Sequence, residues 1–161
     1  KDPATFLDGA GMARERMMKG TFPEPIVRRF AEMLDYYGQS PVIVRSSSLL
    51  EDNYGNAFAG KYESVFLANQ GSREKRLDDL LEGVRRVYAS TMSEAALRYR
   101  ARRGLLERDE QMALLIQRVS GRVYGDVYLP QVSGVGLSYN PWVWSEYIEP
   151  EAGVMRLVCS R

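Results

Sequence analysis

Apolar side chains recur at helical spacing in the second half of residues 1–40. The stripe consists of Ile26, Val27, Phe30, Met33, Leu34 and Tyr37. Pro25 suits an early helical position and Gly38 suits a helix end. The pattern predicts a helix that begins near Thr21 and ends at Gly38, within a helical lead-in over residues 1–40.

A short β-branched run follows Pro41. Residues 42–44 are Val-Ile-Val, which is typical of a strand buried on both faces, and we expect this strand to end at Arg45. Residues 46–60 hold three serines, two asparagines and two glycines, a loop composition. Residues 62–67 have the pattern of the next strand, so a loop is expected between two strands.

Two further helices are predicted before residue 104. Ser72 can cap the first helix. Its apolar stripe is Leu77, Leu80, Leu81, Val84, Val87 and Tyr88. Thr91 and Glu94 form a capping-box pattern for the second helix, which ends near Gly104.

The C-terminal third has the pattern of a sheet. Short apolar or alternating runs occupy residues 112–119, 123–129, 132–139 and 154–158, with glycine and proline between them. Helices and strands in this mixed order favour an α+β or mixed α/β fold packed in layers. Because 161 residues is about the size of one domain, we expect one domain over 1–161. Its parts are the lead-in, residues 41–104 and a strand-rich part over 105–161.

Composition narrows the classes of function. The chain has 22 basic and 21 acidic residues, so no overall field attracts it to nucleic acid or to an anionic membrane. It has no histidine, which excludes histidine-dependent catalysis, histidine zinc sites and a phosphohistidine carrier within these residues. One cysteine, Cys159, excludes an internal disulfide, and no apolar run reaches the roughly 18 residues of a membrane span. We therefore expect a cytoplasmic protein in which Cys159 is buried, and any anion must bind at a local site.

A guanidinium and several hydroxyls stand together where the first strand opens into the loop. Residues 42–48 are Val-Ile-Val-Arg-Ser-Ser-Ser. The fork of Arg45 can hold two phosphate oxygens, the serines supply donors, and Gly60 lets the backbone approach a ligand closely. Two interpretations remain open, because Arg45 can instead pair with Glu51 or Asp52 and pin the loop.

Two stretches carry a more specific signature. They are Val44-Arg-Ser-Ser-Ser-Leu-Leu-Glu-Asp52 and Ala57-Phe-Ala-Gly-Lys-Tyr-Glu-Ser64, with further agreement over residues 87–91, 113–119 and 133–141. Together they resemble the nucleotide-binding domain of the phosphoenolpyruvate synthase and pyruvate phosphate dikinase family. This resemblance implies part of an ATP-grasp-like domain, in which helices pack on a mostly antiparallel sheet.

The resemblance also implies roles for four residues in binding ATP. Arg45 would contact the phosphates, Gly60 and Ser64 would belong to the loop and strand over them, and Gln117 would lie near the nucleotide. Many relatives carry threonine in place of Ser64, which keeps the hydroxyl. The family's phosphate-binding lysine is not recognisable near the N-terminus, where Lys19 is a poor substitute.

The rest of the family's machinery is expected outside this chain. The resemblance implies Mg²⁺ with its ATP, but we expect the acidic and glutamine metal ligands, the phosphohistidine domain and the phosphoenolpyruvate-binding barrel elsewhere. We therefore predict no catalytic residue and no metal ligand here. The expected partners are ATP and other domains of a larger protein, with no nucleic acid and no membrane.

Two functions remain open for such a chain. It can be the ATP-binding portion of a phosphotransferase, which cradles the phosphates but is not catalytically complete alone. The alternative is a degenerate, non-catalytic regulatory or scaffolding module. A nucleic-acid binder is the third and weakest hypothesis, and it depends on Arg98, Arg100, Arg102 and Arg103, which also suit a helix C-terminus.

Two other clusters have a structural and a functional interpretation. Glu51 and Asp52 could hold magnesium, but we favour bonds to nearby backbone that pin the loop. Tyr139, Trp142, Trp144 and Tyr147 could stack on a ligand, but we favour packing in the core or at a sheet edge.

Overall fold

The structure is a computed structural model that describes residues 3–51 and 60–159. Asp52 and the beginning of the second signature stretch lie outside the described residues. The chain divides into two compact units, Lys1–Val119 and Ser120–Arg161, and each is considered by itself.

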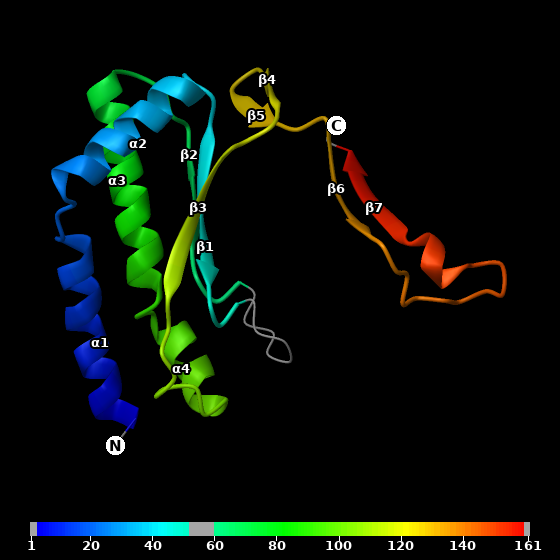
Figure 1. Ribbon diagram of the computed structural model, residues 1–161, viewed down its shortest axis with the longest axis horizontal. Helices are drawn as coiled ribbons and strands as arrows, with labels where there is room; N and C mark the ends of the chain where they lie inside the picture. Colours follow the sequence, from blue (N-terminus) through cyan, green and yellow to red (C-terminus); the bar gives the residue numbers. More distant parts are fainter. Residues whose placement is uncertain (1–2, 52–59, 160–161) are drawn as a thin grey trace. The chain divides into compact units, whose positions relative to one another are not determined.

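The first unit consists of helices packed on an antiparallel sheet. Its described helices are α1 (Pro3–Met18), α2 (Glu24–Tyr37), α3 (Arg73–Ser90) and α4 (Glu94–Arg102). Its sheet has the order β2-β1-β3, formed by β2 (Ser64–Leu67), β1 (Val42–Ser48) and β3 (Met112–Arg118). Helix α3 packs on β1 and β2, and α1 and α2 pack on α3 (Figure 1). This confirms the predicted α+β class and the antiparallel sheet.

The core of this unit lies between α3 and one face of the sheet. Its fully or nearly buried members are Leu34, Val44, Val65, Leu80, Val84 and Val87. In β1 the side chains alternate, so that Val42 and Val44 are 0% exposed, while Arg45 on the opposite face is exposed. The prediction of a strand buried on both faces is therefore wrong. The strand also continues beyond Arg45 to Ser48, because the serines pair with the start of β3.

Local sequence signals set most helix ends correctly. Gly38 follows α2 with a φ of 62°, and the Ser72 hydroxyl accepts a hydrogen bond of 3.2 Å from the Lys75 amide at the start of α3. The predicted capping box of Thr91 is wrong. Ser93 caps α4 instead, and the Thr91 hydroxyl donates to the Tyr88 carbonyl at 2.7 Å, because α3 has only just ended there.

The second unit contains two separate antiparallel ladders. Strand β4 (Arg122–Tyr124) pairs with β5 (Val127–Leu129), and β6 (Val132–Leu137) pairs with β7 (Val154–Cys159). A short helix, η1 (Pro150–Ala152), precedes β7. The predicted continuous run over 123–129 is in fact a hairpin, because Gly125 turns the chain with a φ of 59°.

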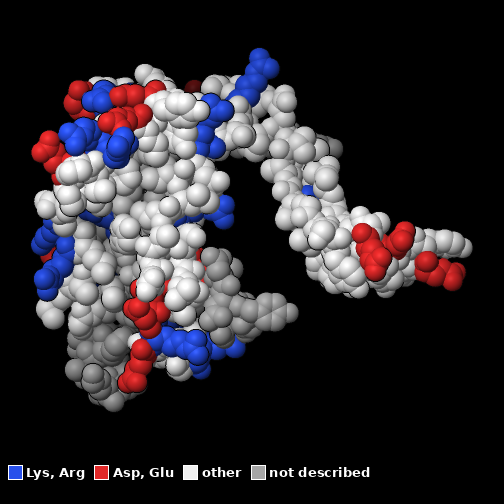
Figure 2. Space-filling model, in the orientation of Figure 1, with Lys and Arg blue, Asp and Glu red and all other residues white. Residues whose placement is uncertain are grey.

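Apolar side chains of the second unit are exposed. Val135 is 53% exposed and Leu157 is 58% exposed, and few charged side chains cover β6 and β7 (Figure 2). Trp144 and Tyr147 are 77% and 90% exposed, and Cys159 is exposed too, so the predicted packing of the aromatic cluster and burial of the thiol are wrong here. The reason is that a two-stranded ladder cannot cover its own side chains.

Candidate phosphate-binding site

A pocket of about 530 Å³ opens on the face of the sheet that carries Arg45. In the described part of the chain, its lining residues are Arg45, Ser46, Ser47, Glu51, Gly60, Tyr62, Ser64 and Leu115. Arg45 pairs across the sheet with Ser64 of β2 and with Leu115 of β3, and directly paired residues of neighbouring strands share a face. The structure thus brings together three of the four residues predicted from the sequence.

The fourth predicted residue, Gln117, lies on the same face but does not line the pocket. It pairs with Ile43, two residues before Arg45 in β1, and its side chain is exposed. Two residues along a strand correspond to about 7 Å. Gln117 is therefore displaced from Arg45 by one pair of residues along the strands, on the same face of the sheet.

Arg45 is an exposed cation without an acidic partner among the described residues. No hydrogen bond or ion pair joins its guanidinium to any residue of 9–51 or 60–159, the ranges whose side chains the structure describes. In particular, Glu51 does not pair with it, which removes one of the two loop-pinning partners considered above. The other partner, Asp52, lies outside the described residues. A guanidinium that lines a pocket without a described acidic partner can bind an anion.

Glu51 instead holds the end of β1 through a reciprocal pair of hydrogen bonds. The Ser48 amide donates to Glu51 Oε2 at 3.2 Å, and the Glu51 amide donates to Ser48 Oγ at 3.2 Å, which is the geometry of a capping box. The Ser46 hydroxyl donates to Glu51 Oε1 at 2.9 Å. Both carboxylate oxygens are thus engaged, which agrees with loop pinning rather than with a magnesium ligand.

This capping box changes the expected role of the three serines. Ser48 is 1% exposed and Ser46 donates to Glu51, so their hydroxyls already have partners. Ser47 makes no side-chain hydrogen bond to a described residue, and the alternation of β1 puts it on the face of Arg45. The Ser-x-x-Glu spacing was present in the sequence and could have identified the capping box.

Tyr62 forms part of the pocket wall and was not singled out from the sequence. Its side chain is 6% exposed, and its hydroxyl donates to Glu110 Oε2. Burial, followed by this bond to a carboxylate, raises the pKa of the Tyr62 phenol well above its ordinary value. No local signal reveals the pair, because 48 residues separate its members.

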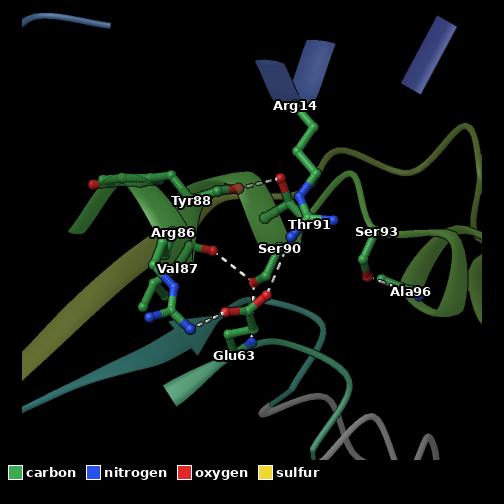
Figure 3. A network of polar contacts seen from close by, with 9 residues as sticks. All are labelled: Arg14, Glu63, Arg86, Val87, Tyr88, Ser90, Thr91, Ser93 and Ala96. Carbon is green, nitrogen blue, oxygen red and sulfur yellow. Dashed lines mark hydrogen bonds and ion pairs between the residues drawn. The ribbon is translucent and has the colours of Figure 1, made fainter. Parts of the chain in front are cut away.

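The segment between Gly60 and Ser64 is also fixed from the helical side (Figure 3). The Glu63 amide donates to Ser90 Oγ at 3.0 Å, and the Ser90 hydroxyl donates to the Val87 carbonyl at 2.6 Å. Arg86 reaches Glu63 Oε2 at 3.2 Å and Arg14 reaches Oε1 at 3.5 Å. These ion pairs are half-exposed and each contributes little, whereas Ser90 is 1% exposed.

Comparison with known proteins identifies the family of this chain. A family model described as "Pyruvate phosphate dikinase, AMP/ATP-binding domain" matches residues 1–155. The chain belongs to this family. The resemblance found in the sequence is thereby confirmed, and the family is one of nucleotide-binding domains.

Two curated relatives in this family of AMP/ATP-binding domains share the name rifampicin phosphotransferase. The protein of Streptomyces sp is 30% identical over 132 residues, which cover 80% of this chain and 14% of the relative. The protein of Bacillus subtilis (strain 168) is 26% identical over 129 residues, which cover 80% of this chain and 13% of the relative. The chain therefore spans a small part of the length of both relatives.

Three arginines in and directly after α4, by contrast, have structural partners. Arg98 donates to Glu94 at 2.6 Å, and Arg103 lies over the Tyr99 ring at 5.5 Å. Arg100 is 7% exposed and donates to the carbonyls of the loop that follows the helix, with the shortest bond, 2.8 Å, to Arg108. These contacts agree with the helix-end interpretation of the stretch.

Metal-ligating side chains do not gather in the described part of this domain. Across residues 9–51 and 60–159, no group of three or more His, Cys, Asp or Glu side chains is close enough to hold a metal ion. Nor is any helix in these ranges long and apolar enough to cross a membrane.

Proposed function

We propose that this chain cradles the phosphates of ATP as one portion of a larger phosphotransferase, and that it is not catalytically complete alone. The observation that carries the proposal is the Arg45 guanidinium, which has no acidic partner among the described residues and lies in a pocket that Gly60 and Ser64 also line. Membership of a family of AMP/ATP-binding domains supports the nucleotide. The names of the relatives support the reaction class, and their greater length supports additional domains, such as a phosphohistidine domain.

Each pocket residue would have a distinct task in holding ATP. The Arg45 fork would neutralise two phosphate oxygens at once, and the hydroxyls of Ser47 and Ser64 would donate to others. Gly60 has a φ of 75°, a conformation that favours glycine, and it lacks a side chain that would obstruct the phosphates. Gln117 would lie beside the more distant part of the nucleotide. The chain would thus position the ATP phosphates and neutralise their negative charge, which are the main requirements of phosphoryl transfer.

Magnesium does not fit the described residues by the chemistry of their donors. Glu51, the acidic residue among the described residues of the pocket wall, already accepts hydrogen bonds at both oxygens. We therefore propose that Mg²⁺ arrives with ATP and that its protein ligands lie outside the described residues. An ATP-grasp-like fold, a single domain over 1–161 and a cytoplasmic location also belong to this proposal.

Thermal unfolding in the presence of millimolar Mg-ATP tests the proposal. A ligand that binds only the folded state at a hundred times its Kd adds about 2.7 kcal/mol of stability. The unaltered chain should show such a shift and Arg45→Ala should lose it. The matched control is Arg28→Ala on α2, which removes another exposed arginine without a described partner and should keep the shift. A chain that gains no stability from Mg-ATP would instead be the regulatory or scaffolding module.

A further inference from the structure

Tyr62 occupies a position in the pocket to which the proposed function gives no task. It stands midway between Gly60 and Ser64, and all three residues line the pocket. Its ring belongs to a second small core with Leu50, Ala96 and Leu105. The ring therefore anchors the pocket-lining segment to the body of the first unit.

The hydroxyl of this ring makes a long-range connection to the sheet. It donates to Glu110 Oε2, and Glu110 lies two residues before the start of β3. The other carboxylate oxygen, Glu110 Oε1, is buried and has no hydrogen-bond partner among the described residues. Among the described residues, Tyr62 is therefore the hydrogen-bond donor to this carboxylate. The bond connects residues 60–64 to the beginning of β3.

The same segment is tied to the helices from its other side. The adjacent Glu63 amide donates to the buried Ser90 hydroxyl at 3.0 Å (Figure 3). Tyr62 is therefore bonded to the segment that precedes β3, and the neighbouring Glu63 is bonded to the end of α3. Such a double attachment restricts where Gly60 and Ser64 can lie relative to Arg45.

We infer that Tyr62 and Glu110 form a positioning pair, which holds Gly60 and Ser64 at the spacing that the ATP phosphates require. This inference rests on the proposed function, because the segment must be positioned for a ligand. When a binding arrangement is only partly populated, the apparent Kd rises in proportion. A hydrogen bond to a charged group changes an equilibrium by a factor of about 10 to 100. Loss of the pair should therefore weaken ATP binding, although the hydroxyl that is removed is already bonded to Glu110.

Titration calorimetry with Mg-ATP tests the pair through Tyr62→Phe, which keeps the ring and removes the hydroxyl. The expected result is a Kd about tenfold higher than that of the unaltered chain. The matched control is Tyr37→Phe, which removes a phenol hydroxyl that donates to the Ile116 carbonyl of β3 at 3.3 Å, outside the pocket. Its Kd should stay within about twofold of the unaltered value.

Variants of the acceptor distinguish positioning from general stability. Glu110→Gln keeps an oxygen that can accept from Tyr62 and should keep the Kd, whereas Glu110→Ala should raise it as Tyr62→Phe does. Combining Tyr62→Phe with Glu110→Ala should add little, because both changes remove the same bond. Circular dichroism checks that each variant folds. If Tyr62→Phe does not fold, the comparison of the two Glu110 variants tests the inference.

The outcomes separate this inference from the proposed function. If the unaltered chain binds Mg-ATP and Tyr62→Phe binds it equally well, the positioning pair is overturned and the proposed function stands. If Tyr37→Phe weakens binding as much as Tyr62→Phe does, the positioning pair is overturned as well and the proposed function again stands. If the unaltered chain binds no Mg-ATP, the proposed function fails and the inference fails with it.

Discussion

Replacing Ser90 with alanine should destabilise the first unit by removing a buried acceptor. Ser90 is 1% exposed, and its oxygen accepts a 3.0 Å hydrogen bond from the Glu63 amide. Alanine fills nearly the same space, so the packing loss is small. The amide of Glu63, however, would lose its partner in a part-buried place, which costs about 1–3 kcal/mol. We therefore expect the free energy of unfolding to fall by that amount.

Thr91 offers a matched control in the next position. Its hydroxyl donates to the Tyr88 carbonyl at 2.7 Å, but that carbonyl also accepts from the Thr91 amide at 3.1 Å. Thr91→Val removes the hydroxyl and keeps the side-chain volume, and it leaves the Tyr88 carbonyl with a partner. It should therefore cost less than about 1 kcal/mol, the net value of an ordinary hydrogen bond.

Urea unfolding followed by far-ultraviolet circular dichroism measures the difference. A gap of about 1 kcal/mol or more between Ser90→Ala and Thr91→Val is expected. The Ser90 bond also fixes the segment between Gly60 and Ser64, so Ser90→Ala should weaken Mg-ATP binding as well. Equal stability of the two variants would refute the idea that the Glu63 amide depends on Ser90.

Two further predictions concern a surface ion pair and the pocket. The hydrogen bond from Arg73 lowers the pKa of Asp35 below its ordinary value of 3.8. The ion pair therefore contributes its full stability above pH 3.8, and this contribution is lost as the pH falls through the lower pKa of the folded state. Asp35→Asn should therefore flatten the acid side of a stability profile below about pH 4, measured by thermal unfolding, and an unchanged profile would contradict this. In the pocket, Ser64→Thr keeps the hydroxyl and should preserve the Kd for Mg-ATP in calorimetry. Ser64→Ala should raise this Kd about tenfold, and equal Kd values for the two variants would speak against the hydroxyl.

The helices were largely predictable because their signals are local. Gly38 and Ser72 each mark a helix end through the conformation or the hydroxyl of that same residue. Where two local signals competed, the sequence could not decide between them. Thr91 and Ser93 can both cap a helix, and the outcome depended on how far α3 extends.

The sheet was predictable in its strands but not in its pairing. The length of β1 depends on Met112 and its neighbours, which lie more than sixty residues further along the chain. This distant partner extends the strand through a serine-rich segment that has the composition of a loop. Likewise, the Val-Ile-Val run cannot reveal that the described helices of the first unit cover only one face of the sheet.

The candidate site was predictable only as far as the family signature extends. The signature identified Arg45, Gly60 and Ser64, and the pairing of β1 with β2 brings Arg45 and Ser64 together. The Tyr62–Glu110 pair could not be found in this way, because its members are 48 residues apart and meet only in the folded chain.

Recognition of phosphate by Arg45 is tested most directly by comparing ligands with and without phosphates. Titration calorimetry would measure the Kd of Mg-ATP and of adenosine for the unaltered chain and for Arg45→Ala. Since a hydrogen bond to a charged group changes an equilibrium by a factor of about 10 to 100, we expect Mg-ATP to bind at least about tenfold more tightly than adenosine. In Arg45→Ala this preference should largely disappear while adenosine binding is unchanged. An undiminished preference for Mg-ATP in Arg45→Ala would show that the phosphates are held elsewhere.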